Sequence, residues 1–301
     1  MVAYVDEAGE KGLVRNLMPH RDSKVALLSA LLFPLPEIDQ FRAVFEPLFT
    51  RFKNEGGARF EKVHIAAAYQ PGNEDLRPMA DEVRAGIFQQ LSDKRVPIIY
   101  AARRLRVLRE GYEATQKAIA HAEQISAQAR AGRPKRIEIP KRPSDERIEQ
   151  DLVSSLTLLL DAYADDFGIT QIDLATDQMD LPIAAGLTER MSAMRSISFS
   201  QTVVKTYDLT VHQPSQRTIT FKVNDSPFPL DVKHLCELIV VGKDDPLVFA
   251  ADAVVNALND HLLSLPADAP VNATSSIQNW TLQNRVWGAR IAVEETLPAI
   301  W

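Results

Sequence analysis

The sequence lacks the features that define several classes of protein. Its single cysteine, Cys236, excludes an intramolecular disulfide and a zinc cluster built from cysteines, and it is typical of a reducing compartment. No apolar run approaches ~20 residues, and the first residues do not combine a basic segment with an apolar stretch. We therefore expect a cytoplasmic protein with no membrane partner.

Positive charge is also in short supply. The 34 Lys and Arg residues are outnumbered by 40 Asp and Glu residues, so the formal net charge is −6. A polyanion would therefore have to be held by local basic segments or by bound cations. Segments 103–109 and 130–142 are rich in Arg and Lys and could hold a nucleic-acid backbone, although solvated charge is the commoner explanation of such runs.

Several catalytic motifs are absent as well. No glycine-rich stretch matches a P-loop or a dinucleotide fingerprint, and there is no Gly-x-Ser-x-Gly elbow. His64, His212 and His234 have no recognisable metal-ligand spacing, so a structural or surface role is the commoner interpretation of each.

What is present is an alternation of strand and helix patterns along 301 residues, 46% of them hydrophobic. Apolar and β-branched runs predict strands at 1–6, 24–34, 96–105 and 169–177, and 234–241 is a short apolar segment. Helical spacing and capping residues predict helices at 36–57, 73–94, 110–131, about 145–166, 184–196 and 245–265. Further β segments are expected at 196–204, 207–213 and 217–223, with a hairpin around Pro214 and Ser215, and 59–68 fits either strand or loop. This alternation predicts an α/β fold, with a mixed sheet and helices packed on its faces.

Local changes in composition predict an insertion and a C-terminal extension. A stretch rich in proline and basic residues breaks the alternation, so we expect a helical and basic-loop insertion at about 105–147 within a domain spanning 1–265. The C-terminal extension, 266–301, holds all of the tryptophans, which are Trp280, Trp287 and Trp301. Such a tail docks on its own domain, forms a homodimer contact or binds a protein partner.

Two of the predicted strands end in aspartate. In "YVDEAGEKG", Asp6 shares one side of the strand with Tyr4. Glu7 shares the other side with Val5, so only one of the two carboxylates points into a given site. Asp177 ends "ITQIDLATD" in the same way, and the two aspartates would lie close together if their strands are neighbours.

A third carboxylate lies within an apolar helix. In "LVFAADAVVNAL", Asp252 is surrounded by alanine, valine and phenylalanine, and Asn256 follows one turn later on the same face. An isolated buried carboxylate costs several kcal/mol or more, so it needs a partner, a hydrogen bond or a cation. Pairing with an arginine or a helix N-terminus is as good an explanation of Asp252 alone. Together with the two strand-end aspartates, it favours a metal site.

Three carboxylates suit Mg²⁺ or Mn²⁺, which prefer oxygen ligands and keep waters for substrate phosphates. Two such ions about 4 Å apart activate a water and stabilise the leaving oxygen in phosphodiester hydrolysis. Bound cations would also offset the repulsion between an acidic site and a phosphate.

At these residues the chain resembles a known family. "YVDEAGEKG" resembles the N-terminal Asp-Glu-Ser-Gly signature of the family catalogued as domain of unknown function 3800, and "ELIVVGKDDPLVFAADAVVNAL" resembles its C-terminal pattern. The resemblance covers roughly residues 1–265. It implies a ribonuclease H-like fold and a metal-dependent nuclease activity, in some members within mobile-element or phage-defence settings.

The resemblance also assigns residues. It makes Asp6, Asp177 and Asp252 the metal ligands, with Glu7 and Glu61 as weaker candidates. Ala8 stands where the family has serine, and Ala250 and Ala251 stand where it has Gln-Leu, which removes polar groups that orient ligands. Near the final motif, Lys233, His234, Lys243 and Asn256 are candidates for contact with a substrate phosphate.

Two hypotheses follow from the sequence. The first is a nuclease that depends on Mg²⁺ or Mn²⁺ and hydrolyses phosphodiester bonds at the three aspartates. The second is an interaction protein without catalytic activity on the same scaffold, in which the carboxylates form a polar network and the tail or a basic segment binds a protein or nucleic-acid partner.

Overall fold

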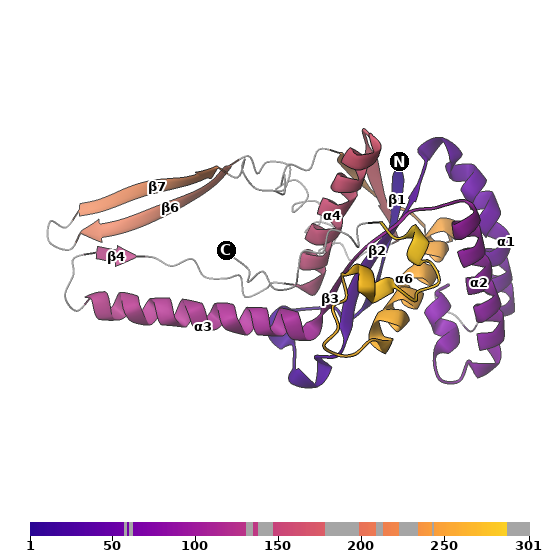
Figure 1. The fold of residues 1–301 in the computed structure, drawn as a ribbon, viewed down its shortest axis with the longest axis horizontal. Coiled ribbons are helices and arrows are strands. Elements are labelled where there is room, and N and C mark those ends of the chain that lie inside the picture. The colour runs from indigo at the N-terminus through magenta and orange to yellow at the C-terminus, as the bar shows by residue number, and fades with distance from the viewer. Residues whose placement is uncertain are drawn as a thin grey trace.

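A mixed five-stranded sheet forms the centre of the protein (Figure 1). The computed structural model describes residues 1–56, 59, 63–130, 135–137, 147–177, 199–208, 213–222, 234–242 and 244–287. The strands of this sheet, in spatial order, are β3 (Ile98–Arg104), β2 (Val25–Phe33), β1 (Val2–Gly9), β5 (Ile172–Thr176) and β8 (Leu235–Val240). β2 is antiparallel to β1 and β3, whereas β5 is parallel to both β1 and β8. The chain is therefore an α/β protein, as its alternating pattern predicts.

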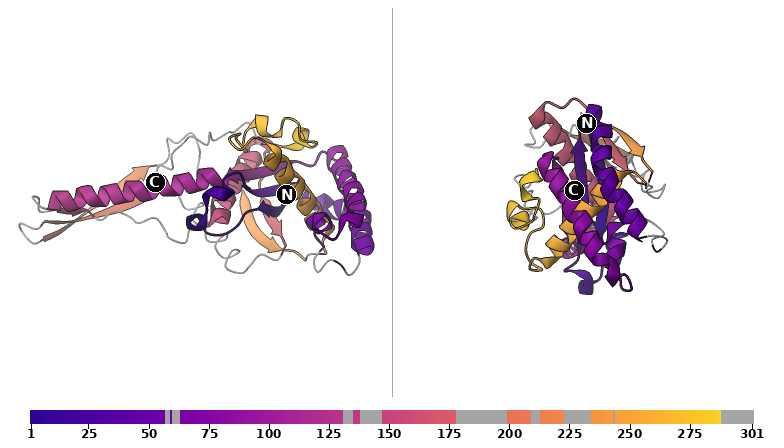
Figure 2. Two further views of the ribbon diagram at one scale, coloured as in Figure 1. Left: turned by 90° about the horizontal axis from the view of Figure 1, so that it is seen from below. Right: turned by 90° about the vertical axis from the view of Figure 1, so that its right-hand side faces the viewer.

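Helices cover both faces of the central sheet. The helices are α1 (Ile38–Gly56), α2 (Arg77–Asp93), α4 (Ile148–Phe167) and α6 (Pro246–Ser264). α6 packs on one face together with α1 and α2, and α4 packs on the other (Figures 1 and 2). We call these sides the α6 face and the α4 face. None of the described helices is long and apolar enough to cross a membrane.

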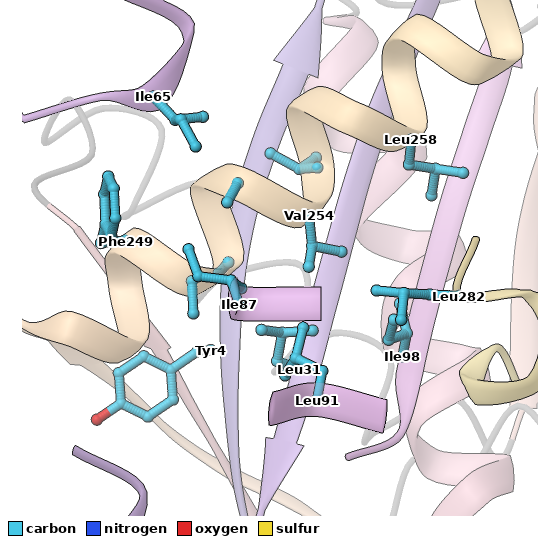
Figure 3. Close-up of a cluster of buried hydrophobic side chains, with 14 of the residues drawn as sticks. Tyr4, Leu31, Ile65, Ile87, Leu91, Ile98, Phe249, Val254, Leu258 and Leu282 are labelled. Atoms are coloured by element: carbon cyan, nitrogen blue, oxygen red, sulfur yellow. The ribbon is translucent and has the colours of Figure 1, made fainter. Parts of the chain in front are cut away.

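Burial explains why these segments form these elements. Every residue of β2 is buried, as expected for an almost wholly apolar strand covered on both faces. α1 buries phenylalanines at helical spacing, namely Phe41, Phe45, Phe49 and Phe52. α6 lies between the sheet and the two outer helices, so it is apolar nearly all round, and Val254 and Leu258 face Leu31 and Ile98 (Figure 3). A carboxylate on such a helix is therefore conspicuous.

Part of the C-terminal extension docks on its own domain at the β3 edge of the sheet. Trp280 is buried against Phe88, and Trp287 packs edge-on against Tyr163 of α4. The Trp287 backbone N–H donates to the Ile98 carbonyl at 2.9 Å. The tail thus covers an edge that would otherwise present unpaired backbone groups. Trp301 lies outside the described residues.

A second group of elements projects away from the central sheet (Figures 1 and 2). It consists of the long helix α3 (Leu105–Arg130) and a three-stranded sheet of β4 (Lys135–Ile137), β6 (Phe199–Asp208) and β7 (Gln213–Lys222). All ten residues of β6 pair with β7, antiparallel. We call α3, β4, β6 and β7 together the arm.

The arm changes some of the expected boundaries. The helix expected at 110–131 already begins at Leu105, and the insertion includes β6 and β7 as well as residues near 105–147. The hairpin prediction around Pro214 and Ser215 is wrong, because both residues lie within β7, paired with Tyr207 and Thr206 of β6. Local β propensity marks the strands but does not say which strand each one pairs with.

Other boundaries differ at the ends of elements. α4 begins at Ile148 with Arg147 at its N-cap, rather than near 145 after a serine cap. Residues 65–69, which fitted either strand or loop, form a short 3₁₀ helix. The helix expected at 184–196 lies outside the described residues.

Candidate functional site

The sheet register brings two strand-end aspartates side by side. β1 and β5 are parallel neighbours, and Val5 is paired with Thr176. The next residue on each strand is Asp6 and Asp177, and adjacent strands lie about 4.8 Å apart. The register therefore places Asp6 beside the residue that follows β5, and the charge of Asp177 acts on Asp6.

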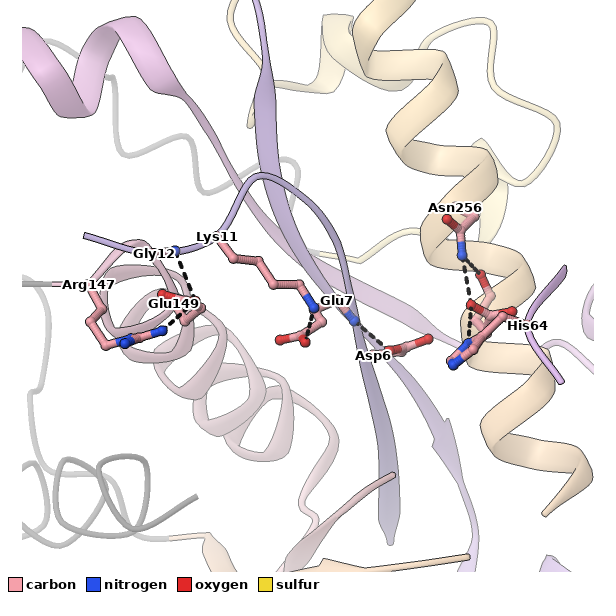
Figure 4. Close-up of polar contacts among 9 residues, drawn as sticks. Asp6, Glu7, Lys11, Gly12, His64, Arg147, Glu149 and Asn256 are labelled. Carbon is pink, nitrogen blue, oxygen red and sulfur yellow. Dashed lines mark hydrogen bonds and ion pairs between the residues drawn. The ribbon is translucent and has the colours of Figure 1, made fainter. Parts of the chain in front are cut away.

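Asp6 and Glu7 leave β1 on opposite sides (Figure 4). Asp6 shares the α6 face with Tyr4, which belongs to the apolar cluster under α6. Glu7 shares the α4 face with Val5 and forms an ion pair with Lys11. The chain then turns at Gly9, whose φ is +85°, and where an added Cβ would lie 2.1 Å from the Val25 carbonyl oxygen.

Asp252 reaches the same face of the sheet from α6. It is only 4% exposed, and its Oδ2 accepts the Ile65 backbone N–H at 2.6 Å. Its Oδ1 accepts the Asn256 side-chain amide at 2.7 Å and lies 3.3 Å from His64 Nδ1 (Figure 4). Asn256 also donates to the Asp252 carbonyl, one turn back along the helix. These contacts fix the orientation of the carboxylate.

Electrostatics couple the three aspartates. Burial raises the pKa of Asp6 well above its usual range, and the negative charge of Asp252 raises it further. A hydrogen bond from the Glu7 backbone N–H, 2.8 Å long, opposes this rise in the pKa, whereas the charges of Asp177 and Glu7 add to it. The side-chain charges acting most strongly on Asp6 are therefore all negative.

The donor set fits a hard divalent cation. Carboxylate oxygens are the ligands that Mg²⁺ and Mn²⁺ prefer, and a cation would offset the repulsion that Asp6 experiences from Asp252 and Asp177. In the present arrangement, no three His, Cys, Asp or Glu side chains among the described residues are gathered tightly enough to surround one ion. Both oxygens of Asp252 instead accept hydrogen bonds from within the protein, from the Ile65 backbone and the Asn256 side chain.

Ser29 was missed by the sequence analysis. It lies directly opposite Asp6 in the antiparallel register, and residues opposite each other in such a pair project on the same face. Ser29 is fully buried, and its hydroxyl has no hydrogen-bond partner among the residues that the structure describes. The signal was the one hydroxyl residue in the otherwise apolar run "VALLSALLF". His64, to which we gave a structural role, was the second residue overlooked beside the site.

The structure separates His234 from the aspartates. The His234 backbone carbonyl accepts the N–H of Ile172, the first residue of β5, whereas Asp177 follows the last. Its side chain contacts Asp165 of α4 at 2.9 Å, and this hydrogen bond raises the pKa of His234. His234 therefore lies at the opposite end of β5 from Asp177, and its contact with a substrate phosphate stays a prediction. Glu61, Lys233 and Lys243 lie outside the described residues, as does His212.

The basic segment 103–109 is largely committed to internal contacts. Arg104 is 1% exposed and donates to several backbone carbonyls, including those of Leu262 and Pro266 at the end of α6. Arg103 forms an ion pair with Asp151, and Arg109 forms one with Asp22. Of the segment 130–142, only Arg130 and 135–137 are described. Arg103, Arg104 and Arg109 are therefore engaged within the protein, and nucleic-acid binding by segment 103–109 stays a prediction.

The alanines that differ from the family pattern are packed in the core. Ala8 is 8% exposed, and Ala250 and Ala251 are essentially buried in the apolar cluster of the α6 face. Polar side chains at these positions would have to be accommodated among apolar neighbours. The local packing is therefore consistent with alanine.

Comparisons with protein-family models, with curated proteins and with solved structures each found no match. The resemblance to the family with the Asp-Glu-Ser-Gly signature stays a prediction.

Proposed function

We propose that the protein is a nuclease that depends on Mg²⁺ or Mn²⁺ and hydrolyses phosphodiester bonds at Asp6, Asp177 and Asp252. The observation that carries the proposal is the buried Asp6, which β1 places beside the end of β5 and on which the negative charges of Asp252 and Asp177 act. Buried carboxylates of this kind persist when they bind a cation or are compensated by hydrogen bonds. A ribonuclease H-like fold is part of the proposal. It is supported by three antiparallel strands followed by two that run parallel to the first.

Each aspartate has a distinct task in this proposal. Asp6 and Asp177 project from neighbouring strands and would bind a cation from the sheet side. Asp252 would bind it from the helix side, with Asn256 holding the carboxylate against rotation. Bound cations would lower the pKa of a water nucleophile and stabilise the leaving oxygen. Glu7 projects to the other face, so it lies outside this ligand set.

The experiment that tests the proposal compares two aspartates of β5. Asp177→Asn removes a proposed ligand, and Asp173→Asn makes the same change on the same strand at its other end, where Asp173 is paired with Val2. Labelled DNA and RNA are incubated with each variant in Mg²⁺ or Mn²⁺, and Mn²⁺ binding is followed by calorimetry. We expect Asp177→Asn to lower the cleavage rate by about 100-fold or more and to weaken Mn²⁺ binding. Asp173→Asn should do neither.

Two results would contradict the proposal. If the wild type shows neither Mn²⁺ heat nor divalent-dependent cleavage, the nuclease assignment fails. Cleavage that survives EDTA or Asp177→Asn would show that the activity does not belong to this site.

One observation favours the second hypothesis, a polar network without catalysis. Both oxygens of Asp252 already have protein donors, which is how a purely structural carboxylate is satisfied. Asp252→Asn separates the two functions, because asparagine keeps the shape but loses the charge and one acceptor. Lost cleavage with an unchanged melting temperature supports the nuclease. A large fall in melting temperature, with no cleavage by the wild type, supports the structural network.

A further inference from the structure

The arm has dimensions that suit a nucleic-acid duplex. β6 and β7 each contain ten residues, so the ribbon is about 33 Å long. One turn of B-form DNA measures about 34–36 Å, and its major groove admits a two-stranded β-ribbon. The ribbon projects from the central sheet, and α3 extends in the same direction (Figures 1 and 2). A duplex could therefore lie along the arm beside the globular part of the protein.

Charge on the arm is opposite in sign to that of the whole chain. Its strands contain five basic residues, which are Lys135, Arg136, Lys205, Arg217 and Lys222. Asp208 is the one acidic residue of these strands, whereas acidic residues outnumber basic ones in the whole chain, 40 to 34. Asymmetry of this kind between parts of a chain is a feature of nucleic-acid-binding proteins.

The backbone register places four of these five residues in one half of the ribbon, whereas Lys222 is paired with Phe199 at the other end. Lys135 and Arg136 of β4 are paired with Asp208 and Tyr207 of β6. Lys205 follows two residues back along β6, and Arg217 of β7 is paired with the neighbouring Val204. Basic residues from three strands thus occupy one stretch of a single small sheet.

We propose that the arm is the surface that grips the sugar–phosphate backbone of a double-stranded nucleic acid. This inference rests on the proposed function, because the duplex held by the arm is the substrate of the carboxylate site. Phosphate contacts made by Lys and Arg supply affinity without reading sequence. The arm therefore supplies the positive charge that the acidic chain otherwise lacks, and it predicts binding with little sequence preference.

The test replaces four arm residues and measures binding without catalysis. The variant carries Lys135→Gln, Arg136→Gln, Lys205→Gln and Arg217→Gln. Anisotropy of a labelled DNA duplex of about 20 bp, roughly two turns, is measured in EDTA from about 50 to 200 mM salt. We expect at least about tenfold weaker binding at the low-salt end, and a slope of log K against log salt reduced by up to about 3–4, since each lost phosphate contact removes about 0.9.

The control removes the same charge from the globular part. It carries glutamine at Arg51, Lys53, Arg59 and Arg77, whose side chains are 41–54% exposed. We expect this variant to bind the duplex with the wild-type affinity and salt slope. Far-UV circular dichroism and the melting curve of both variants check that each remains folded, and single arm substitutions replace the quadruple variant if it does not.

Several outcomes overturn the inference. Equal loss of binding in the arm variant and the control would assign the effect to net charge alone. Tighter binding of single strands than of duplex, or binding of heparin or an acidic protein as tight as that of duplex, would rule out the duplex as the preferred partner. Binding to an RNA duplex instead of DNA would keep the surface and change the substrate.

The duplex-binding assay is carried out in EDTA without divalent metal, so it tests the arm independently of the proposed nuclease activity. If duplex binding depends on the arm but Mn²⁺ binding and cleavage are absent, the nuclease fails and the arm surface stands. If cleavage depends on Asp177 while the arm variant binds and cleaves duplex like the wild type, the arm inference fails and the nuclease stands.

Discussion

Two adjacent carboxylates on opposite faces of the central sheet have different charged neighbours. On the α4 face, Glu7 has Lys11 as a partner and Glu149 has Arg147. On the α6 face, the side-chain charges acting most strongly on Asp6 are all negative. Asp6 and Glu7 are adjacent in the sequence, so the difference arises from the face and not from the residue type.

This difference supports the proposal that a cation binds on the α6 face. A carboxylate beside a lysine or arginine has its counter-charge within the protein, and its neighbourhood gains little from a metal ion. Asp6 instead meets other carboxylates in a buried setting, which raises its pKa and destabilises its charged form. A divalent cation would reverse both effects, which is why we assign metal binding to the α6 face alone.

The largest effect that tests the difference between Asp6 and Glu7 is the pH dependence of the free energy of unfolding, measured without metal. Because the pKa of Asp6 is raised on folding, first by burial and then by Asp252, the folded state holds its proton more tightly than the unfolded state does. The free energy of unfolding should therefore fall as pH rises from the ordinary carboxyl pKa, near 4, to the raised pKa, and the loss should persist above it. Asp6→Asn removes this loss, so in EDTA the variant should be more stable at neutral pH, by about 1 kcal/mol or more.

Melting curves of the wild type and Asp6→Asn across pH check this prediction. The stability difference should vanish below about pH 3, where Asp6 is protonated in both states. Mg²⁺ at neutral pH should raise the melting temperature of the wild type but not of the variant. A variant that is less stable than the wild type at neutral pH in EDTA would show that an unrecognised positive partner compensates Asp6.

Local patterns predicted much of the site, and long-range pairing explains what they missed. The period of two separates Asp6 from Glu7 on any strand, and the position of Asp177 at a strand end follows from its own segment. The pairing of β1 with β5, and the position of Ser29 opposite Asp6, depend on how distant segments of the chain align in the sheet. Arg104 shows the same limit, because the carbonyls that bind it come from residues far along the chain. The ligand role of the aspartates stays a prediction.

A smaller effect is expected from Ser29, whose hydroxyl lies on the same face as Asp6. Ser29→Ala breaks no hydrogen bond present in the structure, so its free energy of unfolding should change by less than about 0.5 kcal/mol. If the hydroxyl orients Asp6 or a bound water during catalysis, cleavage should fall by about tenfold.

Ser155→Ala is the matched control for Ser29. Ser155 is on α4, and its hydroxyl accepts a hydrogen bond from Arg103 at 2.9 Å. Its loss should cost about 1 kcal/mol of stability and leave the cleavage rate unchanged. Equal effects of the two substitutions on cleavage would contradict a specific role of the Ser29 hydroxyl at the site.

The smallest effect is expected at Glu7, the residue next to the proposed ligand. Its partner Lys11 is half exposed, and such a pair contributes about 0–1 kcal/mol. Glu7→Gln should therefore change stability by less than about 1 kcal/mol. Because Glu7 projects to the α4 face, the Mn²⁺ affinity measured by calorimetry should stay within about threefold of wild type, well short of the 10–100-fold cost of disturbing a metal ligand. A larger loss of affinity would make Glu7 a ligand. It would contradict the assignment of the metal site to the α6 face, because Glu7 projects to the α4 face.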